Sequence, residues 1–246
     1  MHKAIILAAC EGILFGISMF FFMLDKNGGP DGLYSKELYK REYKNVSIAG
    51  GLDDTSVNEE LINLANEYVD YVGYISVEGT SIHYPVMRDR TDATGYYYYL
   101  SHNYMGESDS SGCPFIRRSS DLSDDVLEVF AHNNRNGTMF ADLMRFEDED
   151  FFNDNGLIHF DTVDGCRTYK VISVLDVAVD GGEYTFFGWS NFPDEQTETE
   201  FLSQITEYGV VKTHEPVSPG NQYLLLVTCE YTHVDGRRIV VAIRTS

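Results

Sequence analysis

Short runs of apolar and β-branched residues alternate with turn-forming residues along most of the chain, a pattern typical of β-strands. Many short strands separated by turns favour a closed or sandwiched β structure rather than a helical one. The sequence therefore predicts a mainly β protein, with strands at 72–77, 81–87, 126–131, 157–161, 168–179, 223–229 and 238–243.

Helical spacing of apolar residues is confined to a few segments. A capping-box pattern at 56–59, followed by apolar residues from Leu61 to Val69, predicts a helix from about 56 to 70. A second helix is predicted at about 194–209, where Thr197 and Glu200 again have capping-box spacing. We expect a third helical stretch near 138–152.

The longest apolar run, residues 4–24, lies at the N-terminus. A helix that spans a membrane needs about 20 such residues. Glu11 interrupts the run at a cost of about 3 kcal/mol, which the surrounding Leu, Ile and Phe residues outweigh. We interpret the run as a single uncleaved membrane anchor; a cleaved signal peptide and a lipidated Cys10 are the alternatives.

The chain then divides into an anchor at 1–26, a polar stalk at 27–54 and a folded body at 55–246. Charge around the anchor is only weakly biased, but Asp25 and the acidic body favour a body outside the membrane. The predicted localisation is therefore a single-pass membrane protein with an extracytoplasmic domain.

The chain is strongly acidic, with 18 Lys and Arg against 39 Asp and Glu and a net charge of -21. Such a surface repels a phosphate backbone, so we expect no nucleic-acid partner. Outside the anchor the cysteines are Cys113, Cys166 and Cys229, an odd number at wide spacing. This pattern argues against a disulfide framework and a zinc site, and we expect neither a metal nor a cofactor.

Two candidate reactive groups lie where the last two predicted strands meet. Asp235 and Gly236 form a turn signal between these strands, which should pair in antiparallel fashion. Cys229 would end the first strand and Arg238 would begin the second, so the two should lie together at one rim. A guanidinium there can favour the thiolate or stabilise an oxyanion. A buried structural cysteine near a surface arginine is the simpler alternative.

A histidine that follows a strand supplies a candidate base. His132 ends the apolar run 126–131 and begins a polar turn, so its position matches that of Cys229. His102 is the alternative, whereas the remaining histidines lie within strand patterns or in less informative contexts.

Together these motifs resemble the sortases, and class B sortases in particular. The resemblance covers residues from about 55 to the end of the chain. It is carried by LVTC at 226–229 with the arginine at 238, AHNNRNGTMF at 131–140, VGYISVEGTSIHYPV at 72–86, the segment 98–118 and the helix at about 194–209.

The resemblance implies an eight-stranded sortase β-barrel with an N-terminal helix and a helix inserted between late strands. It implies a membrane-bound cysteine transpeptidase of Gram-positive cell envelopes, in which Cys229 is the nucleophile, His132 the general acid and base, and Arg238 the stabiliser of the oxyanion. Such an enzyme cleaves a Pro-x-Thr-type sorting motif of a surface protein after Thr. It passes the acyl group to an amine of a peptidoglycan precursor or to a pilin lysine.

Further residues are predicted to contact the substrate, namely Thr228 and Glu230 beside the nucleophile and Asn133 beside the histidine. Arg237 precedes Arg238 and competes with it for the arginine role, but the Ile-Val-Val that follows favours Arg238.

Two other functions compete with the transpeptidase. An extracytoplasmic cysteine hydrolase of the papain type usually places Cys before His and at the start of a helix, whereas here His comes first and Cys229 ends a strand. A membrane-tethered β domain that only binds a partner would leave Cys229 inert toward thiol reagents.

Overall fold

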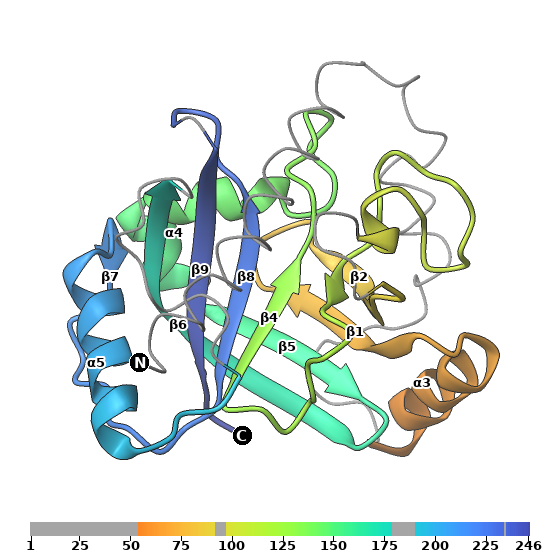
Figure 1. The fold of residues 1–246 in the computed structure, drawn as a ribbon, viewed down its shortest axis with the longest axis horizontal. Helices are drawn as coiled ribbons and strands as arrows, with labels where there is room; N and C mark the ends of the chain where they lie inside the picture. The colour runs from red at the N-terminus through yellow and green to blue at the C-terminus, as the bar shows by residue number, and fades with distance from the viewer. Residues whose placement is uncertain (1–53, 92–96, 179–189, 234) are drawn as a thin grey trace, which may run out of the picture.

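The computed structural model describes residues 54–91, 97–178, 190–233 and 235–246 (Figure 1). The predicted anchor, and the stalk up to residue 53, lie outside the described residues. Within the described ranges, no helix is long and apolar enough to span a bilayer.

A β-barrel forms the body of the protein. The hydrogen-bonded order of its strands is β5-β1-β2-β3-β4-β8-β9-β6-β7, and a further pairing of β5 with β6 closes eight of them into a ring. The predicted eight-stranded barrel is confirmed. The strands are β1 (Tyr71–Val77), β2 (His83–Arg88), β3 (Phe115–Ile116), β4 (Val126–Phe130), β5 (Leu157–Thr162), β6 (Gly165–Ala178), β7 (Val211–Lys212), β8 (Tyr223–Cys229) and β9 (Gly236–Arg244).

Two strand pairs in the barrel are parallel, and one of them carries the candidate site. β4 pairs with β8 in parallel, while β8 pairs with β9 and β9 with β6 in antiparallel fashion. Because β4 and β8 run the same way, their C-terminal ends meet at one end of the barrel, and the β8–β9 turn lies there too (Figure 1, upper part).

The helices lie outside the barrel. The predicted N-terminal helix is α3 (Asp54–Glu67), and the predicted inserted helix is α5 (Glu195–Glu207), which lies between β6 and β7 along the chain. Asp194 caps α5 by accepting a hydrogen bond from the Thr197 backbone N–H at 2.8 Å. The N-cap therefore lies about one turn before Thr197, and the capping box predicted at Thr197 was wrong. The stretch predicted near 138–152 divides into a 3-10 helix, η2 (Ala141–Glu147), and α4 (Glu149–Asp154).

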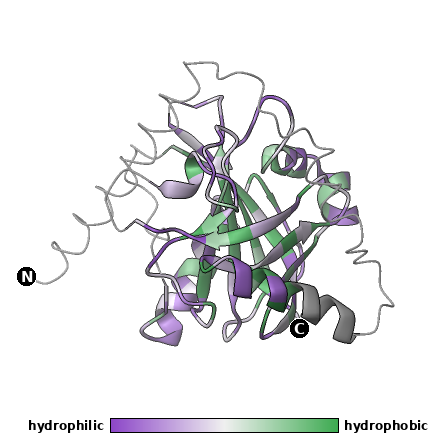
Figure 2. Cartoon of the chain, turned by 90° about the vertical axis from the view of Figure 1, so that its right-hand side faces the viewer, coloured by the Kyte–Doolittle hydropathy of each residue, from purple (hydrophilic) through white to green (hydrophobic). Residues whose placement is uncertain are grey.

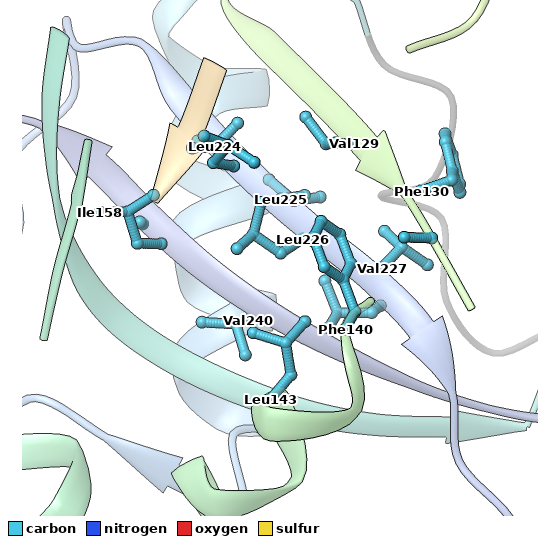
Figure 3. Close-up of a cluster of buried hydrophobic side chains, with 14 of the residues drawn as sticks. Val129, Phe130, Phe140, Leu143, Ile158, Leu224, Leu225, Leu226, Val227 and Val240 are labelled. Carbon is cyan, nitrogen blue, oxygen red and sulfur yellow. The ribbon is translucent and has the colours of Figure 1, made fainter. Parts of the chain in front are cut away.

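The core fills the inside of the barrel with aliphatic and aromatic side chains. Leu224 and Leu226 of β8 pack with Val129 of β4 and Val240 of β9, and all four are fully buried (Figure 3). Green hydrophobic segments accordingly concentrate on the strands, and purple hydrophilic segments on the helices and turns (Figure 2).

Phe140 and Leu143 also enter this core, from the segment that follows the predicted histidine (Figure 3). Both side chains have no exposed surface. This burial anchors the far end of the segment that carries His132.

Two strands escaped the sequence analysis, β3 and β7, each of two residues. A pair of residues carries no measurable alternation, so periodicity cannot reveal such strands. The apolar stripe predicted on the first helix is also only partly buried, because Ile62 remains 42% exposed and Val69, beyond its end, 90% exposed.

Candidate active site

Cys229 is the last residue of β8 and lies between β4 and β9. Its side chain is buried, with 4% of the residue exposed. The pairing of its two neighbouring strands decides which side chains lie beside it.

On the β4 side, the register brings His132 next to Cys229. Phe130 pairs with Val227, and the Ala131 N–H donates to the Val227 carbonyl at 3.2 Å, which continues the same register by one step. The next step places His132 beside Cys229. Residues paired in a parallel ladder project to the same face of the sheet, so thiol and imidazole share a face.

On the β9 side, the register places Arg237 beside Cys229. Cys229 pairs with Arg237, and Thr228 pairs with Arg238. The expected juxtaposition of Cys229 and Arg238 is therefore corrected, because β9 begins at Gly236, two residues earlier than the sequence suggested. A shift of one residue moves a side chain to the other face of a sheet.

Two rows of side chains consequently cross the sheet at this end of the barrel. The cysteine row consists of the paired residues Cys229, Arg237 and Val177, together with His132, which lies where the β4–β8 register would continue to Cys229. The threonine row consists of Ala131, Thr228, Arg238 and Asp176, on the opposite face.

Arg238 forms hydrogen bonds with Asp176 of the threonine row and with residues of η2. Its guanidinium makes a bidentate contact with the Asp176 carboxylate at 2.8 and 2.6 Å, and donates to the Met144 carbonyl at 2.8 Å and to Glu147 at 3.1 Å. Only 3% of its side chain is exposed. Burial opposes its charge, but the contacts with Asp176 and Glu147 outweigh this and raise the pKa of Arg238. These contacts tie β9 to β6 and to η2.

His132 is oriented by the backbone at the C-terminal end of η1 (Tyr98–Leu100). Its Nε2 lies 2.8 Å from the Leu100 carbonyl. A carbonyl oxygen can only accept, so Nε2 carries the hydrogen, and Nδ1 is the atom that can act as a base. Burial lowers the pKa of His132, and the hydrogen bond to Leu100 opposes this only in part, so the neutral imidazole is favoured.

Gly112 lies in the loop between η1 and β3 and lets this loop approach the imidazole closely. It has φ +66, and a Cβ at this position would lie 2.6 Å from the Tyr99 carbonyl and 3.2 Å from His132 Cδ2. A side chain here would displace the ring or the loop. His102, the alternative histidine, lies in this loop and stacks on Tyr98 with ring centroids 3.8 Å apart.

Glu230 lies directly after the nucleophile and turns into its own loop. Its carboxylate accepts hydrogen bonds from the Thr232 N–H at 2.7 Å and from the His233 N–H and Nδ1 at 3.2 and 2.8 Å. Burial opposes ionisation, but these bonds outweigh it and lower the pKa of Glu230 to about 2. The carboxylate thereby shapes the turn that leads from Cys229 to Arg237.

The other two predicted substrate contacts also make internal bonds. Thr228 is 1% exposed and donates from Oγ1 to the Ala131 carbonyl at 2.9 Å. Asn133 donates from Nδ2 to the Cys229 carbonyl at 2.9 Å. Thr228, Asn133 and Glu230 therefore use their polar groups to hold the backbone around Cys229.

Comparison with known proteins reveals relatives in sequence and in fold. No family model matches the chain. Sortase B of Listeria monocytogenes is 25% identical over 212 residues, which cover 84% of this chain and 80% of the relative. The crystal structure of Clostridium perfringens sortase B is 29% identical, with a TM-score of 0.68, and the match covers 75% of this chain and 99% of that one. The chain is similar to class B sortases in both sequence and fold.

A third relative shares the sortase fold at lower identity. The Staphylococcus aureus sortase B–substrate complex is 21% identical, with a TM-score of 0.70, over 91% of this chain and 99% of that one. Helix α5 between the late strands, and α3 before the barrel, are the class B traits expected from the sequence.

This similarity identifies the protein as a cysteine transpeptidase of the sortase type. A purely binding β domain is thereby set aside. Cys229 and Arg237 pair across β8 and β9, and His132 follows the end of the neighbouring strand β4.

Sequence reasoning missed one contributor to the site and ranked another, Arg237, second to Arg238. The Leu100 carbonyl is a backbone group without a sequence signature. Arg237 could have been found from the true start of β9, because the pairing across a hairpin is fixed by where both strands begin and end.

Proposed function

We propose that this sortase cleaves a Pro-x-Thr-type sorting motif after Thr and joins the acyl group to an amine of a cell-wall precursor. The observation that carries the proposal is the cysteine row, in which His132 and Arg237 flank Cys229 from the two neighbouring strands. The Staphylococcus aureus sortase B described above was solved with a substrate, which supports a peptide ligand for this fold.

Three members of the row, His132, Cys229 and Arg237, take part in the reaction. His132 takes the thiol proton, and the Cys229 sulfur attacks the Thr carbonyl carbon of the motif. The resulting oxyanion collapses, the carbon–nitrogen bond breaks, and the imidazolium returns the proton to the leaving amine. A thioester remains on Cys229. The acceptor amine then attacks the thioester, loses a proton to His132, and releases the thiol.

Arg237 is the arginine that we assign to the oxyanion. Its side chain starts on the same face as Cys229, whereas Arg238 starts on the opposite face and is already paired with Asp176. A preorganised cation near a developing negative charge lowers the barrier, and such groups typically contribute about 10²–10³ in rate.

The location of the reaction follows from the N-terminal run at 4–24. We propose that this run anchors the protein in the membrane of a Gram-positive-type envelope, with residues 55–246 outside. Sorting signals and the peptidoglycan precursor amine meet on that side, and a pilin lysine is the alternative acceptor. An acidic surface with a net charge of -21 supports partners other than nucleic acid.

Intact-mass spectrometry of the full-length chain, mixed with a pool of Pro-x-Thr peptides, tests the proposal. We expect an adduct equal to the peptide minus its leaving group, which identifies the motif directly. Cys229→Ala should abolish the adduct, whereas Cys166→Ser, which removes an exposed thiol elsewhere on the barrel, should leave it unchanged. An adduct that persists in Cys229→Ala, or none from any peptide, would overturn the proposal.

A further inference from the structure

The backbone ladder between β4 and β8 ends just before the reactive residues. Its last pair is Phe130 with Val227, followed by the single bond from the Ala131 N–H to the Val227 carbonyl. β8 continues to Cys229, but the chain after β4 turns away into a loop that closes with Phe140 N–H donating to the His132 carbonyl at 2.8 Å. His132 is therefore the first residue beyond the ladder.

A parallel ladder repeats every two residues, so the next bond donated from the β4 side would run from the Asn133 backbone N–H to the Cys229 carbonyl. In the structure this carbonyl accepts from the Asn133 side chain instead, at 2.9 Å from Nδ2. The side-chain amide takes the place of the missing backbone donor.

Further side-chain bonds surround this contact. Thr228 Oγ1 donates to the Ala131 carbonyl at 2.9 Å, and Tyr231 Oη donates to the Asn133 carbonyl at 2.8 Å. The segments 131–133 and 228–231 are thus connected by three bonds that each join a side chain to a backbone carbonyl. His132 lies between Ala131 and Asn133, whose carbonyls accept two of these bonds.

We infer that Asn133 is a positioning residue, which holds His132 beside Cys229 by supplying the hydrogen bond that the β4–β8 backbone stops making. Its amide acts on the Cys229 carbonyl, while its own backbone is joined directly to His132. Tyr231 supports the same connection from the rim of the site, where 56% of the residue is exposed. The inference rests on the proposed chemistry at Cys229, and it replaces the substrate contact that the sequence predicts for Asn133.

The physical reason for a catalytic effect is geometric. Proton transfer between Cys229 and Nδ1 requires a separation close to hydrogen-bond length, and a misplacement of about 1 Å can lower a rate by about 10²-fold. A buried carbonyl left without its donor would also seek another partner, which moves the backbone of the nucleophile.

The experiment compares Asn133→Ala, Asn133→Asp and Tyr231→Phe in the full-length chain. Asparagine and aspartate have the same shape, but a carboxylate cannot donate to the Cys229 carbonyl. We measure cleavage of a quenched fluorescent peptide carrying the motif that forms the adduct, and separately the alkylation of Cys229 by iodoacetamide between pH 5 and 9, read from the Cys229 peptide by mass. The second assay needs no substrate.

We expect Asn133→Ala and Asn133→Asp to lower kcat by about 10- to 100-fold with KM within about twofold, and to move the pH midpoint of alkylation upward, because His132 no longer lies beside the thiol. Tyr231→Phe should lower kcat by about threefold, in keeping with the loss of one hydrogen bond, and should move the pH midpoint of alkylation in the same direction. Asn221→Ala removes a similar amide-to-carbonyl bond of 3.0 Å, to Ser218, just before β8 begins. This control should change neither assay.

Two results would overturn the inference while leaving the transpeptidase intact. A raised KM with unchanged kcat and alkylation would make Asn133 a substrate contact, and unchanged values in all variants would remove it from the site. If Asn133→Ala unfolds, the alkylation profile of Tyr231→Phe decides: an unchanged midpoint contradicts the inference. Peptide turnover that survives Cys229→Ala would instead contradict the proposed function.

Discussion

The cysteine row and the threonine row cross the same strands one residue apart, yet their side chains are used in opposite ways. In the threonine row, Thr228 bonds to the Ala131 carbonyl and Arg238 makes a bidentate pair with Asp176. In the cysteine row, Arg237 pairs with Cys229, and His132 lies where the β4–β8 register would continue to Cys229. We assign the first row to holding the barrel end together and the second to the reaction.

This contrast teaches that neighbouring arginines of one strand can have unrelated roles. Arg237 and Arg238 differ by one position, and the pleat of β9 sends them to opposite faces. Changes in the cysteine row should therefore reduce activity with little change in stability, and changes in the threonine row should do the reverse.

The largest expected effect is that of Arg237→Ala on the rate. Removing one oxyanion-stabilising group typically lowers kcat by about 10²–10³, so we expect a loss of this size in peptide cleavage. The melting temperature should change by no more than about 3 °C, since about 1 kcal/mol shifts it by about 2–4 °C in a protein of this size. Single-turnover acylation and thermal unfolding measure the two quantities.

Arg237→Lys sharpens this prediction, because it keeps the charge but loses the planar donors. It should recover only part of the rate. Full activity of Arg237→Ala would return the oxyanion role to Arg238 and would break the contrast between the two rows.

Arg238→Ala should act mainly on stability. It leaves the Asp176 carboxylate without its bidentate partner in a site where the arginine side chain is only 3% exposed and that of Asp176 16% exposed. Breaking a buried pair by removing one partner costs about 3 kcal/mol, which predicts a melting temperature lower by about 6–12 °C.

A double-mutant cycle with Asp176→Ala isolates this pair. We expect a coupling free energy of about 1–3 kcal/mol and single-turnover acylation within about threefold of the wild type at a temperature where every variant is folded. A severe loss of acylation with an unchanged melting temperature would contradict the structural assignment of Arg238.

The smallest effect concerns Glu230, which shapes the turn between the two strands. Glu230→Gln should lower the free energy of unfolding by about 2 kcal/mol at pH 7, because hydrogen bonds to a charged acceptor are lost. The pKa of Glu230 is lowered from 4.5 to about 2 in the folded protein, so its contribution is complete above about pH 4.5 and disappears as the pH falls toward 2.

Denaturant unfolding of both proteins between pH 7 and pH 2.5 measures this effect. The two stabilities should converge as the pH falls. A difference that stays constant with pH would show that the ionised carboxylate is not what holds the turn.

The strongly patterned parts of the barrel were predictable because burial on both faces leaves a clear apolar run. β8 was predicted with its bounds, Tyr223–Cys229, and β1, β4 and β5 to within one residue. The candidate nucleophile and base could be found because Cys229 and His132 each end such a run. β3 and β7 could not, since two residues carry no period.

The sequence by itself determined the class of the fold, the strands of the core and the thiol and imidazole at the strand ends, because hydrophobic periodicity and residue chemistry are local properties. Only the tertiary structure decided which arginine lies beside Cys229 and what Asn133, Thr228 and Glu230 bind. Those outcomes depend on the register between strands distant along the chain, where a shift of one residue exchanges the two faces of the sheet.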